Sequence, residues 1–235
     1  MKLLSAELKR LKYNLILWGL VLVSAVYGVV MAVQCRDLPG GAEFLRAVLS
    51  DPVMSIWMCS LLPVVLVGQE FASREVDWFL FSGHRRREYF GIKAAELVVF
   101  TGILCGIPPL FMLFGKLGGV GAGELLRLLC LRLLLDCSLT AFGMLFAFLL
   151  RDLNRCAAVS LTYGILVQTL YKLQSGNAYQ STLGTAYRLL RLHPVSYYKE
   201  AMSGTLPPGK IAAVLIFIGL AAVISYAAFH RAELK

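Results

Sequence analysis

The chain has 235 residues, of which 58% are hydrophobic and only 16% are charged, and its formal net charge is +9. A soluble domain of this size would contain about 25% charged residues, so the composition argues against a soluble protein and indicates a polytopic membrane protein. In such a protein lysine and arginine concentrate in cytoplasmic loops, so the positive charge does not indicate nucleic-acid binding.

The N-terminal twelve residues, MKLLSAELKRLK, place their leucines near one helical face and charged side chains around most of the rest. This pattern predicts a short interfacial helix over residues 1–12 that lies on the inner membrane surface. Residues 13–33 form the first apolar run, which is longer than a typical signal-peptide core, and no A-x-A-like site follows it. We therefore expect an uncleaved first span.

Five further apolar runs follow, separated by short polar stretches. The second run begins at Pro52, where we predict Asp51 as the N-cap and Pro52 as a first-turn proline, and it contains Pro63, where we predict a kink. The sequence thus predicts an all-α integral membrane protein with six transmembrane helices in a single domain over residues 1–235. The predicted spans are residues 13–33, 52–68, 93–115, 125–150, 156–171 and 211–229.

The distribution of lysine and arginine sets the predicted orientation. Six spans place both termini on one side, and the loops and tails on that side contain 13 of these residues, against 8 in the opposite loops. By the positive-inside rule both termini are expected in the cytoplasm, with the protein in the plasma membrane. Residues 69–92 then form a cytoplasmic segment, and residues 172–210 form an extracytoplasmic one.

Residues 69–96, which read QEFASREVDWFLFSGHRRREYFGIKAAE, are the densest charged stretch of the chain. A charge at the bilayer centre costs about 2.5–3.5 kcal/mol, so this segment must face water. It mixes both signs of charge with six aromatic residues, a combination that suits a protein interface. The alternative is an inner loop whose Arg85, Arg86 and Arg87 follow the positive-inside bias and contact lipid headgroups.

Arg132 and Asp136 lie four residues apart inside the fourth predicted span, so their side chains can meet on one helix face. An ionisable pair at this depth has two interpretations. It could line a substrate path or a subunit seam, or it could be a self-neutralised pair that is satisfied inside the bundle.

Enzyme chemistry finds little support in the sequence. The six cysteines show no CxxC spacing and no nearby histidine, which predicts neither a disulfide framework nor a metal site. Residues 204–210 formally fit G-x-x-x-x-G-K, but the hydroxyl residue that binds Mg²⁺ is missing and two prolines remove N–H groups that a phosphate cradle needs. We therefore predict no catalytic residue, no cofactor in this chain and no enzymatic activity.

The charged segment resembles an inner motif of membrane-spanning permease subunits of type-2 ABC exporters, E-F-x-x-G-T-x-x-x-x-L-x-x-G-x-S-R-x-x-Y-x-x-x-K. The motif covers about 24 residues, whereas the order of surface helix, six spans, charged inner loop and extended outer segment covers nearly the whole chain. Arg74 and Glu75 replace the glycine–threonine pair of the motif, and Arg85 stands where serine is common. The matching residues are Glu70, Phe71, Leu80, Gly83, Arg86, Tyr89 and Lys93.

The resemblance implies a permease that lacks an ATPase of its own. It would pair with a second permease chain, as a homodimer or a heterodimer, and with ABC ATP-binding subunits that hold the ATP. Substrates of similar systems include antimicrobial peptides, antibiotics, lipids and polysaccharides. The residues expected to couple the permease to its ATPase are Glu70, Phe71, Arg74, Glu75, Asp77, Gly83, Arg85, Arg86, Arg87, Tyr89 and Lys93.

Two other functions stay open at this point. A secondary transporter or channel would carry an inverted repeat and central ionisable residues, and no convincing repeat is visible. A non-transporting membrane scaffold or an immunity-type protein would need no coupling surface for an ATPase.

Overall fold

The computed structural model describes residues 9–34, 41–116, 121–175, 192–204 and 206–231, and all regular elements within these ranges are helical. The predicted helix over residues 1–12 lies largely outside them. After a helical stretch at residues 9–13, the elements are α2 (Leu15–Gln34), α3 (Gly41–Ser50), α4 (Val53–Pro63), the π-helical turn η1 (Val64–Gly68), α5 (Gln69–Ala72), α6 (Glu75–Phe81), α7 (Arg86–Lys116), α8 (Ala122–Leu150), α9 (Leu153–Ser175), the 3-10 turn η3 (Pro194–Tyr197), α11 (Tyr198–Met202) and α12 (Pro208–His230).

The described helices support an all-α membrane protein. Five stretches are long and apolar enough to cross a membrane, namely α2, the continuous run α4–η1–α5, residues 86–107 of α7, α8 and α12. The predicted span at residues 156–171 lies in α9, which is long enough but less apolar and is not among the five.

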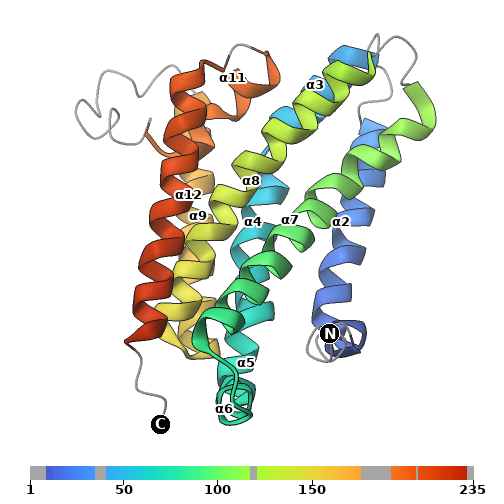
Figure 1. Ribbon diagram of the computed structural model, residues 1–235. Coiled ribbons are helices and arrows are strands. Elements are labelled where there is room, and N and C mark those ends of the chain that lie inside the picture. Colours follow the sequence, from blue (N-terminus) through green and yellow to red (C-terminus); the bar gives the residue numbers. More distant parts are fainter. Residues whose placement is uncertain (1–8, 35–40, 117–120, 176–191, 205, 232–235) are drawn as a thin grey trace.

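The long helices form a bundle with two different ends (Figure 1). One end, which we call the α6 end, contains the short helices α5 and α6, the beginning of α2 and the end of α12. The other, which we call the α11 end, contains α3 and α11. Helix α8 packs against α4, α7, α9 and α12. In the most apolar part of α4–η1–α5, 72% of the residues are buried, against 17% in the corresponding parts of α2 and α12, whose exposed valine and leucine side chains suit contact with lipid.

Two stretches that the sequence predicts as loops contain helices. Helix α3 forms within the predicted polar loop before the second span, because Leu45 and Leu49 lie one turn apart and are both buried. Helix α7 begins about two turns before the predicted span at residue 93. At this start the backbone N–H of Arg85 donates to the Glu88 carboxylate at 3.2 Å, as in half of a capping box.

Pro63 lies at the predicted kink and is followed by the π-helical turn η1. Its ring cannot donate a backbone hydrogen bond, so the helical ladder is interrupted where the turn widens. Gly143 of α8 faces this point. A Cβ atom added to Gly143 would lie 2.9 Å from Pro63 Cγ and 3.4 Å from the Cys59 carbonyl oxygen, so the close approach of α4 and α8 requires glycine there.

We predict that Gly143→Ala destabilises the bundle, because the proline ring and the Cys59 backbone cannot yield without moving a helix. Overpacking of this kind costs about 1–3 kcal/mol. The measurement is the free energy of unfolding of the protein in detergent, obtained from a titration with sodium dodecyl sulfate. Gly219→Ala on α12 is the matched control, because a Cβ atom there has no neighbour within 4 Å. Equal effects of the two substitutions would contradict the packing argument.

Candidate functional site

A largely buried cluster of charged and polar side chains lies at the α6 end and comprises Arg10, Glu70, Tyr89, Lys93 and Glu96; we call it the Glu70 cluster. Lys93 Nζ lies 2.7 Å from Glu70 Oε1 and 2.9 Å from Glu96 Oε2. The Tyr89 hydroxyl donates to Glu70 Oε2 at 2.5 Å, and Arg10 makes an ion pair with Glu70. The side chain of Lys93 is fully buried, and that of Glu70 is 4% exposed.

Local sequence explains how these groups meet. Tyr89, Lys93 and Glu96 are spaced by four and three residues, so they share one face of α7. Glu70 is the second residue of α5, which follows the buried turn η1, and its carboxylate faces into the bundle. A buried lysine or glutamate without a partner is strongly destabilising, so the two must be buried together. The cluster therefore ties α5 and the helical stretch at residues 9–13 to α7.

A second connection links α7 to the end of α12. Arg86 Nη1 donates to the carbonyl oxygens of Phe229 and His230, both at 2.7 Å. Both carbonyls belong to the last turn of α12, where a cation also suits the negative end of the helix dipole. Beneath this contact the rings of Phe71, Phe148 and Phe229 pack edge to face or tilted, with centroids 5.1–6.2 Å apart.

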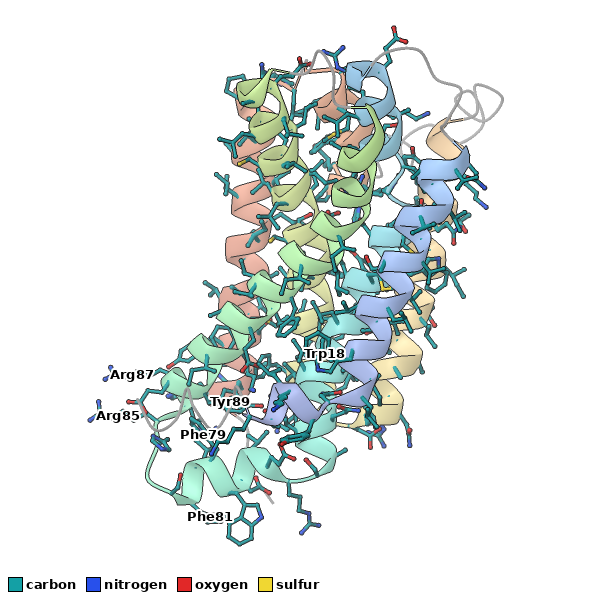
Figure 2. All side chains as sticks on the ribbon, turned by 90° about the vertical axis from the view of Figure 1, so that its right-hand side faces the viewer. Trp18, Phe79, Phe81, Arg85, Arg87 and Tyr89 are labelled. Carbon is teal, nitrogen blue, oxygen red and sulfur yellow. The ribbon has the colours of Figure 1, made fainter. Side chains whose placement is uncertain are left out.

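Helix α6 presents two large aromatic side chains to the outside of the bundle. Trp78 is 75% exposed and Phe81 is 87% exposed, whereas Val76 is buried. Figure 2 shows Phe81 pointing away from the bundle and Phe79 on the side of Tyr89, whose ring centroid is 5.2 Å from that of Phe79. One side of α6 therefore packs on the bundle, and the other is apolar and open.

The turn before α6 has an unusual backbone. Arg74 adopts the left-handed conformation, with φ of 59°, at the position where the related motif has glycine. Glycine adopts this conformation without steric cost, whereas another residue loses about 1–2 kcal/mol. Gly83, in the turn after α6, has φ of 89° and is a glycine in both the motif and this chain.

The predicted coupling residues separate into two groups in space. Those that face the bundle or pack on it are Glu70, Phe71, Arg86, Tyr89 and Lys93. Those at the exposed surface around α6 are Arg74, Glu75, Gly83, Arg85 and Arg87, with Asp77 half-buried. Arg10 and Glu96 were not predicted for this site. Arg10 is 60 residues from Glu70 in the chain, and no local pattern connects them.

A second polar cluster lies toward the α11 end and comprises Ser55, Arg132, Asp136 and Tyr198; we call it the Asp136 cluster. Arg132 Nε lies 3.1 Å from Asp136 Oδ2, and the Tyr198 hydroxyl donates to Asp136 Oδ1 at 2.5 Å. Asp136 is completely buried. Burial and the charge of Asp136 raise the pKa of the Tyr198 phenol well above its usual range, so this phenol is a neutral donor.

The remaining donors of Arg132 hold the turn between α3 and α4. Arg132 Nη2 donates to the Asp51 carbonyl oxygen at 3.0 Å and to Ser55 Oγ at 2.6 Å, and Nη1 donates to the Leu49 carbonyl oxygen. The guanidinium group also lies 4.7 Å from the centre of the Tyr198 ring. With its charge paired and these donors engaged, Arg132 joins α8 to α3, α4 and α11.

Among the described residues, Cys59, Cys105 and Asp136 are a group that could hold a metal ion. The sequence gives no signal for it, since the two cysteines are 46 residues apart on different helices. No protein-family model matches this sequence, and its comparison with curated proteins finds no significant match.

We predict that Asp136→Asn destabilises the protein, because it leaves the Arg132 charge uncompensated in a buried site, a loss of about 3–5 kcal/mol. Adding Arg132→Gln should recover part of that loss. The measurement is the free energy of unfolding in detergent for each variant.

The exposed pair of Arg46 and Glu124 provides the control. Neutralising either partner there should change the free energy of unfolding by less than about 1 kcal/mol. Purely additive effects of the Arg132 and Asp136 substitutions would show that the pair is not energetically coupled.

Proposed function

We propose that this chain is the membrane-spanning permease subunit of an ATP-driven ABC exporter in the plasma membrane. In this proposal the bundle has six spans, with α9 as the fifth, and both termini are cytoplasmic. The chain forms the translocation path with a second permease chain, and separate cytoplasmic subunits hydrolyse ATP.

The observation that carries the proposal is the construction of α6. This helix follows the second apolar helix and precedes the third, and it bears Trp78 and Phe81 on its open side. Exposed aromatic rings surrounded by charges are typical of the anchors of protein interfaces. A motor that grips α6 needs a rigid connection to the spans, and the Glu70 cluster supplies one through buried ion pairs to α7.

The arginines of this segment favour docking over simple lipid contact. Arg86 is engaged with the carbonyl oxygens at the end of α12, so it serves the bundle and does not extend to headgroups. Arg85 and Arg87 are exposed and point outward in Figure 2. They belong to the same segment as the exposed Trp78 and Phe81, and charges of this kind can set the register of a protein partner.

The topology is tested by cysteine-accessibility labelling of single substitutions, compared with the parent protein. We expect Arg85→Cys, at the α6 end, to react only from the cytoplasmic side. Glu43→Cys, on the exposed face of α3, should react with a membrane-impermeant reagent from outside. The termini are tested at residue 233 and the first outer loop at residue 36, both beyond the described ranges. Labelling of residue 85 from the outer face would invert the topology.

The docking surface is tested by Trp78→Ala with Phe81→Ala, and separately by Asp77→Lys. We expect each to abolish co-purification with the ATP-binding subunit that this proposal requires, while the protein still inserts and folds. Loss of two interface anchors should weaken binding at least a hundredfold, since each costs about 2 kcal/mol or more.

Leu220→Ala is the control for this experiment, because Leu220 is an exposed apolar residue on α12, a helix that spans the membrane in this proposal. It should leave ATPase association unchanged. Normal ATPase binding and export by the α6 variants would exclude α6 as the docking element. If neutralising Arg85 and Arg87 impairs membrane insertion, while the fraction that does insert still binds the ATPase, the lipid-contact alternative would be favoured.

A further inference from the structure

The thiols of Cys59 on α4 and Cys105 on α7 lie side by side within the bundle. Their sulfur atoms are 3.8 Å apart, and both residues are buried, at 1% and 9% exposure. A carboxylate oxygen of Asp136 completes a group whose three ligand atoms all lie within 4.8 Å of one another. Two thiols and a carboxylate from three different helices therefore meet at one point.

We propose that Cys59, Cys105 and Asp136 form a binding site for a thiophilic divalent cation of the zinc and cadmium type. In a tetrahedral site with zinc–sulfur bonds of about 2.3 Å, two thiolate sulfurs are about 3.8 Å apart. The sulfur spacing in this bundle already has that value. Thiolates select soft and borderline ions over Mg²⁺ or Ca²⁺.

Charge favours a divalent over a monovalent ion. Binding removes one proton from each thiol, so the dication and two thiolates sum to zero and the two protons leave to water. The Arg132–Asp136 pair is already neutral as a unit, so the filled cluster stays neutral. A monovalent ion bound by both thiolates would leave one buried negative charge, which is costly in this setting.

The surroundings of the three ligands resemble the outer shell of a metal site. Arg132 and Tyr198 each hold one oxygen of Asp136, which orients the carboxylate and leaves each oxygen a lone pair. The Ser55 hydroxyl donates toward the Cys105 sulfur at 3.6 Å. Partners of this kind fix ligand orientation and support metal affinity. A bound ion would join α4, α7 and α8, the three helices that carry the ligands.

The test uses the full chain, purified in detergent, reduced and stripped with a chelator, and titrated with Cd²⁺. The readout is the ultraviolet charge-transfer absorption of cadmium thiolate. We expect one Cd²⁺ per chain, and at least a tenfold loss of affinity in Cys59→Ser and in Cys105→Ser. Cys156→Ser is the matched control, because Cys156 is also buried but lies on α9. It should bind as the parent does.

A second measurement keeps the test decisive if the serine variants fold poorly. X-ray absorption of the zinc-loaded parent should give two sulfur ligands at about 2.3 Å together with oxygen ligands. Absence of the charge-transfer band in the parent would show that both cysteines act only as small apolar side chains. Fewer than two sulfur ligands on the bound zinc would also overturn the site. So would reoxidation of the reduced Cys59 and Cys105 to a disulfide in the presence of zinc.

Discussion

The burial of Glu70 constrains the whole α6 end of the bundle. A carboxylate with 4% exposure needs compensation, and the Lys93 ammonium and the Tyr89 hydroxyl provide it from α7. Lys93 is itself fully buried and needs the second carboxylate of Glu96. Moving any one of these groups would leave a buried charge without its partner, so α5 and α7 are held in one arrangement. Helix α6 connects the two in the chain.

The Asp136 cluster imposes the same kind of constraint toward the opposite end. Arg132 is neutralised on its own helix and uses its other donors on carbonyl oxygens at the turn between α3 and α4. Between the two clusters the contacts around α8 are largely apolar, and at Gly143 they leave no room for a single methyl group. Closely packed interiors have discrete arrangements and resist continuous deformation. A force applied at α6 would therefore move helices as units, which is the mechanical property that the proposed coupling requires.

Sequence patterns predicted the parts of this structure that depend on local spacing. Long apolar runs indicated the helices, Pro63 marked the interruption in the second one, and the four-residue spacing of Arg132 and Asp136 placed them on one face. Contacts between distant segments left no such signal. Tyr198 is 62 residues from Asp136, and Cys59 is 46 residues from Cys105. Sequence patterns did not predict α3, because ten residues are too few to give a clear helical periodicity.

The turn at Arg74 connects these packing constraints to the proposed function. A left-handed arginine costs about 1–2 kcal/mol relative to glycine, and it persists only where its surroundings fix the backbone. Here the Arg74 carbonyl oxygen accepts from the N–H groups of Asp77 and Trp78, which starts α6 directly after the turn. Because α5 is held by Glu70 and Val76 is buried, a relaxed turn would swing Trp78 and Phe81 away from their present direction. The bundle contacts of Glu70 and Val76 thus fix the direction of α6, although the backbone at Arg74 is strained.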